Sequence, residues 1–160
     1  MKTILNVLLG LLLGYFSYST TLHAASDGMF LIRSTAKAPA AVVEALEDYA
    51  QREKWLFLGA NRVKKGQVTL VKICIPEVGR QVWPVGLHLS AMLPCGNLGI
   101  YQKQGQTEIS LLNPRYMHVL YPHPAIERAS ATAAALLTDM LDVVAAEGES
   151  DRRVNPQPDN

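Results

Sequence analysis

The sequence VTLVKICIP, residues 68–76, carries the strongest strand pattern in this 160-residue chain. β-Branched and other apolar residues dominate it, which is typical of a strand packed within a sheet. Pro76 ends the strand, because proline has no N–H to donate to a neighbouring strand. Residues 77–93 are less regular, and the sequence MLPC, residues 92–95, then indicates a turn. We expect the domain to form around this segment.

Upstream, the pattern predicts a strand over residues 29–34, a helix over 40–54 and a strand over 55–63. Apolar residues recur at three-to-four spacing in the helix, and Tyr49 on that stripe is interpreted as a core aromatic. Gly66 supplies the positive φ of a tight turn, so the strand that precedes it is expected to pair antiparallel with the strand that follows.

The segments downstream are shorter and alternate between helix and strand patterns. They are a short helix over 77–82, a loop or strand over 86–93, hairpin strands over 97–102 and 107–112, a proline-bounded linker over 116–124 and a helix over 125–146. The order is therefore strand, helix, two strands, short helix or loop, two strands, helix. This order predicts a single α+β domain over residues 27–147, a mainly antiparallel sheet with helices packed on one face. The uncovered face is a candidate dimer interface or ligand platform.

The two ends of the chain have compositions of their own. Residues 1–24 have the pattern of a secretory signal peptide, with a basic start, an apolar run and a small residue at the end. We expect cleavage there and a periplasmic or secreted protein. Retention of residues 4–22 would instead give a membrane anchor, with the domain facing the periplasm. Residues 148–160 are polar, which predicts a disordered tail.

The charge balance and the missing motifs exclude several classes of function. Removal of residues 1–24 removes one charge, Lys2, and leaves 14 basic and 14 acidic residues. A nucleic-acid partner is therefore not expected, because such proteins carry a basic excess that neutralises phosphates. No Gly-x-Ser-x-Gly elbow and no phosphate-binding glycine loop occur, so no catalytic residue is assigned.

Three separated motifs are similar to those of a known family. They are LVKICIP at residues 70–76, MLPC at 92–95 and LLNP at 111–114. In this order they resemble the domain of unknown function 302 family over roughly residues 49–114. The resemblance implies a compact α+β fold, often dimeric, and no established activity. It also implies structural roles for four motif positions, Pro76, Pro94, Asn113 and Pro114. The apolar segment 83–88 is longer than is usual for the family.

The two cysteines, Cys74 and Cys95, leave three interpretations open. In an exported chain they can form a structural disulfide, a redox pair or part of a soft-metal site. A Cys-x-x-Cys motif at a helix start is absent, which favours the structural bridge over redox work. Such a bridge would close a loop of about 20 residues and contribute roughly 3 kcal/mol in the chain-entropy model.

A second group of candidate ligands combines imidazole, thioether and thiolate side chains. His88, Met92 and Cys95 share one segment, and His118 follows further along the chain. Such a set suits a soft metal such as Cu(I), or a haem axial site, whereas the alternative is a core methionine with surface histidines. We predict no cofactor, and the absence of Cys-x-x-Cys-His argues against covalent haem.

These observations support one leading functional hypothesis and two alternatives. The leading hypothesis is an exported, non-enzymatic binding or accessory domain, a homodimer or the partner of another protein, which contacts a partner or a small ligand through the sheet face or residues 83–95. The first alternative is a periplasmic redox, thiol-handling or soft-metal protein that uses Cys74 and Cys95. The second is a membrane-tethered accessory subunit of a larger complex.

Overall fold

The computed structural model describes residues 28–93 and 97–146. The predicted signal peptide, the predicted tail, Pro94 and Cys95 lie outside these residues. Within the compact unit that begins at Leu31, a five-stranded sheet packs against helices.

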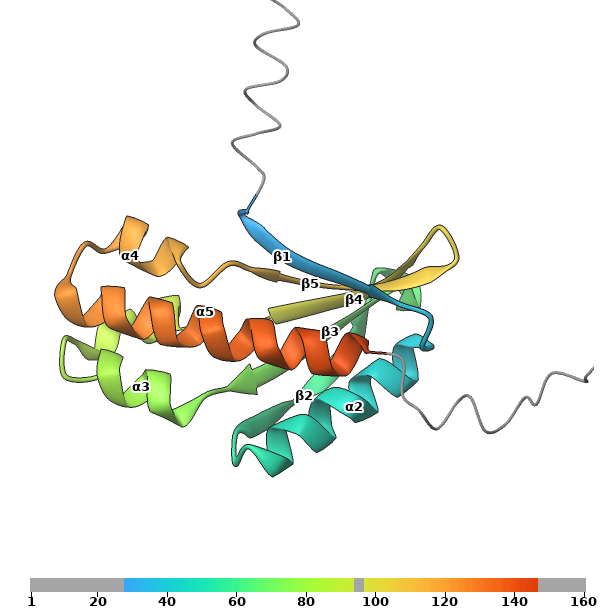
Figure 1. Cartoon of the computed structure of the whole chain (residues 1–160), viewed down its shortest axis with the longest axis horizontal. Helices are drawn as coiled ribbons and strands as arrows, with labels where there is room; N and C mark the ends of the chain where they lie inside the picture. The colour runs from blue at the N-terminus through green and yellow to red at the C-terminus, as the bar shows by residue number, and fades with distance from the viewer. Residues whose placement is uncertain (1–27, 94–96, 147–160) are drawn as a thin grey trace, which may run out of the picture. The chain divides into compact units, whose positions relative to one another are not determined.

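The sheet is formed by strands in the order β1-β5-β4-β3-β2. The strands are β1 (Phe30–Thr35), β2 (Leu56–Val63), β3 (Val68–Cys74), β4 (Asn97–Lys103) and β5 (Gln106–Leu112). The pairs β2–β3, β3–β4 and β4–β5 are antiparallel. β1 lies beside β5 and runs in the opposite direction (Figure 1). The mainly antiparallel sheet that the hairpin pattern predicts is therefore confirmed.

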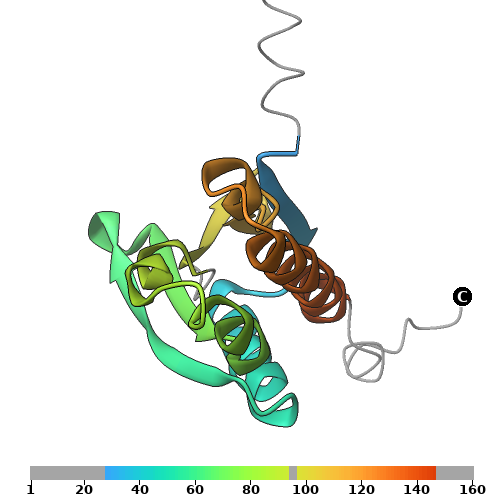
Figure 2. The same cartoon turned by 90° about the vertical axis from the view of Figure 1, so that its left-hand side faces the viewer.

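The helices follow the strands in the predicted order, with one addition. They are α2 (Pro39–Arg52), α3 (Pro76–Val82), α4 (Tyr116–Leu120) and α5 (Pro124–Ala145), with short 3-10 turns η1 (Lys64–Gly66) and η2 (Leu87–Met92). α2 and α5 contact each other, and α3 packs against α5. Figures 1 and 2 show α2, α3 and α5 on the same side of the sheet. The predicted α+β fold with helices on one face is confirmed.

The core lies between this helix layer and the sheet. Alternate residues of β3, β4 and β5 point into it, as Val71, Ile100 and Ile109 do, and each is at most 1% exposed. The apolar stripe of α5 meets them with Leu137 and Met140, also buried. This is the outcome expected where a period-2 strand pattern faces a period-3.6 helix pattern.

Two segments differ from the sequence-based expectation. The segment 116–124 was expected to be a linker, but α4 occupies its first five residues. Asn113 forms a turn just before this helix, in which its side-chain Oδ1 accepts the N–H of Arg115 at 3.1 Å. Residues 87–92, for which a loop or a strand is expected, form a 3-10 turn, with the N–H of Leu89 bonded to the carbonyl of Gly86.

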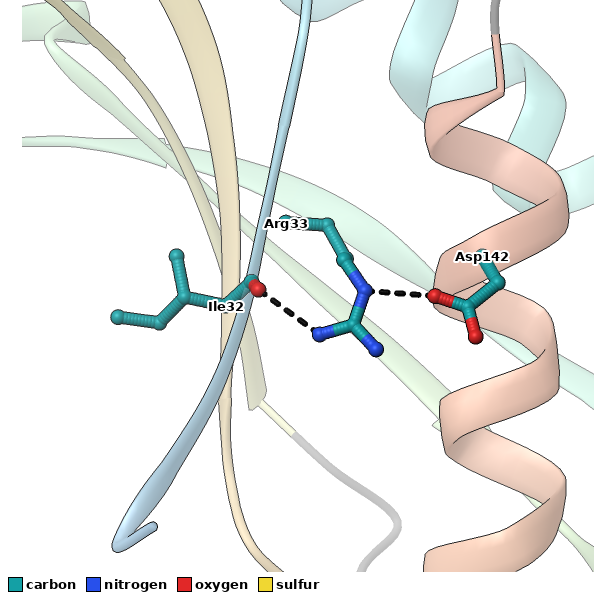
Figure 3. A network of polar contacts seen from close by, with 3 residues as sticks. All are labelled: Ile32, Arg33 and Asp142. Carbon is teal, nitrogen blue, oxygen red and sulfur yellow. Dashed lines mark hydrogen bonds and ion pairs between the residues drawn. The ribbon is translucent and has the colours of Figure 1, made fainter. Parts of the chain in front are cut away.

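Polar contacts tie α5 to the elements beside it. The Tyr49 hydroxyl of α2 donates to Asp139 Oδ2 at 2.8 Å, and Tyr49 is buried as predicted. Arg33 Nε on β1 donates to Asp142 Oδ1 at 2.6 Å, while its Nη1 donates to the carbonyl of Ile32 (Figure 3). Because Arg33 and Asp142 are partly exposed, this ion pair contributes no more than about 1 kcal/mol. The ion pair therefore positions the edge strand β1 but adds little to the stability of the domain.

β2 contains one irregularity of register. Phe57 pairs with Ile73, but the next paired residue on β2 is Gly59, opposite Lys72, so Leu58 is an extra residue. Gly59 has φ of 116°, a conformation that favours glycine. The strand therefore contains a β-bulge.

Candidate functional site

The open face of the sheet is one candidate binding surface. Residues opposite each other in an antiparallel pair share a face, and the pairs that flank the buried ones point away from the helices. Exposed large apolar side chains gather there, namely Ile32, Leu56, Leu58, Val63 and Leu112, between 38% and 56% exposed. An exposed apolar group of this kind is typical of an interaction surface.

A polar cluster lies on the same face. The Tyr101 hydroxyl donates to Glu108 Oε2 at 2.7 Å, and Lys103 Nζ lies 3.0 Å from Glu108 Oε1. The hydrogen bonds from Tyr101 and Lys103 hold the pKa of Glu108 below its ordinary value. The same contacts raise the pKa of Tyr101 and of Lys103. Glu108 is therefore an anion with two fixed donors, and the face carries both signs of charge.

A cavity of about 440 Å³ borders this face, between η2 and α4. Met92 and Met117 line it together with Leu98 and Leu120, so its wall is mainly apolar. Lys72 is its charged lining residue. The volume of this cavity lies within the range of small-molecule sites.

Cys74 ends β3, and its partner candidate lies in the segment that is not described. Cys74 is not a free thiol, and its bridge to Cys95 stays a prediction. The structure therefore gives no support for a reactive thiol at Cys74.

The described part of the structure does not bring the other metal-ligand candidates together. Met92 lines the apolar cavity, whereas the His88 ring contacts Tyr121, with ring centroids 6.2 Å apart. His118 lies on α4, and its buried Nδ1 has no hydrogen-bond partner among residues 28–93 and 97–146. Within residues 28–93 and 97–146, no group of three or more His, Cys, Asp or Glu side chains is placed to hold a metal ion.

The motif residues that are described lie at element boundaries. Pro76 is in the first turn of α3, where a missing N–H costs nothing. Asn113 and Pro114 lie between β5 and α4, where they line the apolar cavity and accept the first backbone bonds of α4. Asn113 and Pro114 thus form part of the wall of the cavity.

Sequence reasoning missed some residues of this region. Lys72 and Tyr116 both line the apolar cavity. The sequence offered one indication of Lys72, because it is the only charged residue of the mainly apolar strand β3. Tyr116 gave none, since its position depends on the short helix α4.

An antiparallel sheet with helices on one face and an open face with a bordering cavity define a two-layer α+β domain. No helix of the described ranges is both long and apolar enough to cross a membrane. Residues 33–144 match the family described as Domain of unknown function DUF302. The chain belongs to this family.

A solved structure shares the fold. It is the crystal structure of an uncharacterized conserved protein DUF302 from Bacillus stearothermophilus, with a TM-score of 0.65 and 20% identity. The similarity covers 74% of this chain and 98% of that chain. At this level of identity the likeness shows the fold alone. No curated protein matches the sequence.

Proposed function

We propose that this protein is an exported accessory domain that binds a protein partner through its open sheet face, and that the partner is a second copy of the chain. The observation that carries the proposal is the concentration of exposed apolar side chains on the sheet face that no helix of residues 28–93 and 97–146 covers. A two-fold interface uses the same patch on both copies, so one apolar face is sufficient.

The charges of the face support this partner, and its area indicates how tightly the two copies would bind. Lys72 and Lys103 lie on it with Glu108, so two copies can place opposite charges against each other. Five strands spaced about 4.8 Å apart and about 3.3 Å per residue give a projected area on the order of 500 Å². A stable interface buries about 800 Å² per partner. The dimer is therefore expected at the weak end of stable complexes, dissociating on dilution.

The test is the oligomeric state of the exported protein across a concentration series, measured by sedimentation velocity. Ile32 on the open face is 44% exposed, and Val143 on the helix side is 45% exposed. Ile32→Glu is expected to shift the protein to monomer, because it places a desolvated charge in the interface. Val143→Glu is the matched control and is expected to leave the dimer intact.

Two results would overturn the proposal. One is a wild-type protein that stays monomeric at the highest soluble concentration. The other is a dimer that Ile32→Glu and Val143→Glu weaken equally. An unfolding temperature of the wild type that rises with protein concentration would support the dimer independently.

Export is part of the same proposal, and the support for it is the signal-peptide pattern of residues 1–24. The mass of the protein recovered from the exporting cell tests it. A mass that begins after Ala24 supports a periplasmic or secreted protein. A mass that includes residues 4–22 contradicts cleavage and favours the membrane-tethered alternative.

A further inference from the structure

A second cavity, of about 560 Å³, lies on the helix side of the domain, between α3 and the start of α5. Two arginines line it, Arg80 from α3 and Arg128 from α5. Tyr121 and His123, which precede α5, form another part of the wall. The cavity is separate from the open sheet face and from the apolar cavity at η2.

The packing of the two helices explains why both arginines face this cavity. Gln81 Nε2 on α3 lies 3.5 Å from Thr132 Oγ1 on α5, so these side chains mark the contact between the helices. Arg80 is next to Gln81 in the chain. Arg128 precedes Thr132 by four residues and therefore lies on the same face of α5, one turn closer to its start.

The charge of the cavity is positive and uncompensated. No Asp or Glu is among its lining residues, and neither Arg80 nor Arg128 forms an ion pair with a described residue. Glu77 and Glu127 occur on the same helices but do not line the cavity. A guanidinium group can bind a carboxylate or a phosphate through two parallel hydrogen bonds. Both arginines are available for such contacts, because neither has a carboxylate partner in the described part of the chain.

Fixed polar groups complete the wall. His123 Nδ1 accepts the N–H of Ala125 at 3.1 Å, so the neutral ring carries its proton on Nε2 and can donate there. The Tyr121 ring contacts the rings of His88 and His123, with centroids 6.2 and 6.3 Å away. Tyr121 and His123 therefore add two polar side chains to the wall, and the positive end of the α5 dipole adds to the positive field of the arginines.

We propose that this cavity binds a small organic dianion, such as a phosphate monoester or a dicarboxylate, held by Arg80 and Arg128. The volume is that of a small-molecule site. Val85 and Pro84 provide apolar contact for the carbon part of the ligand. The two positive charges set the preference for a dianion over a monoanion.

Isothermal titration calorimetry of the full chain tests this site, with inorganic phosphate in one arm and succinate in the other. We expect saturable binding of at least one probe, and the probe that binds identifies the anion class. Arg80→Gln and Arg128→Gln are each expected to weaken binding about tenfold or more, through the lost bidentate contact. Both arginines are exposed, so circular dichroism should show unchanged folding.

Arg62→Gln is the matched control, because Arg62 is an exposed arginine on β2 that does not line the cavity. It is expected to bind the probe as the wild type does. Arg128→Lys, which keeps the charge but not the bidentate geometry, is expected to give an intermediate affinity. Absence of saturable binding by both probes, or an equal loss in Arg62→Gln, would overturn the site. Neither result depends on the oligomeric state.

Discussion

At the scale of single residues, Tyr49 connects the two long helices. Its ring is buried between α2 and α5 and contacts the Trp55 ring, with centroids 5.4 Å apart. Burial, followed by the hydrogen bond to Asp139, raises the pKa of Tyr49 far above its ordinary value. The phenol is therefore neutral and a donor at any physiological pH.

Tyr49→Phe removes this donor while keeping the ring. We expect the free energy of unfolding to fall by about 1 kcal/mol, the usual net contribution of one such hydrogen bond. Chemical denaturation with urea measures it. Tyr116→Phe is the control, since no hydrogen bond of the Tyr116 hydroxyl is described. Equal stability of Tyr49→Phe and wild type would show that Asp139 is fully satisfied by water instead.

Glu108 gives the open face a pH dependence. Its pKa in the folded protein lies below the ordinary value of 4.5. A depressed carboxyl pKa contributes stability that is present above the unfolded pKa and is lost as the pH falls below it. The unfolding temperature of the wild type is therefore expected to decrease as the pH is lowered from about 7 to about 3. The unfolding temperature of Glu108→Gln is expected to decrease less.

The comparison with a second carboxylate makes this measurement specific. Glu44 is exposed on α2 and forms no ion pair with a described residue. Glu44→Gln is expected to keep the pH dependence of the wild type. If the unfolding temperatures of Glu108→Gln and Glu44→Gln depended on pH in the same way, the contacts of Glu108 with Tyr101 and Lys103 would not be the cause of the pH dependence.

At the scale of elements, the register of β3 and β4 bears on the cysteines. Lys72 lies opposite Asn97 in the antiparallel pair. Cys74 follows Lys72 by two residues, and Cys95 precedes Asn97 by two residues. If the antiparallel register continued, the two cysteines would therefore lie opposite each other. Opposite residues in such a pair have Cα atoms about 4.5–5.5 Å apart, within the range that a disulfide spans.

We therefore expect a Cys74–Cys95 disulfide in the exported protein. Alkylation followed by mass measurement should add no label without reductant and two labels after reduction. Cys74→Ala with Cys95→Ala is expected to lower the free energy of unfolding by about 3 kcal/mol. Labelling of both cysteines without reductant would contradict the bridge, and rapid reduction by a mild dithiol would favour a redox role.

The elements also show what the sequence could predict. The hairpin of β4 and β5 was predictable because Gly105 marks its turn, with φ of 82°, between two alternating strands. α4 was not, because a five-residue helix is too short for its period to be recognised. Val119 and Leu120 are also exposed, so no apolar stripe marks it. η2 depends on tertiary contacts, since only Leu89 of its apolar residues is fully buried.

At the scale of the whole molecule, the one-sided helix layer separates two kinds of surface. The open sheet face is apolar with mixed charges, and the helix side holds the cavity of Arg80 and Arg128. The uncovered face followed from the element order in the sequence. The arginine cavity did not, because Arg80 and Arg128 are far apart in the chain and come together only through the packing of α3 on α5.

The bulge in β2 limits how copies of the chain can join. β2 is an outer strand, and the free edge of such a strand is a template on which another chain can extend the sheet. The extra residue at Leu58 and the glycine conformation at Gly59 bend and twist that edge. Edge-to-edge growth into fibres through β2 is thereby disfavoured, which leaves the face of the sheet free for the paired association that we propose.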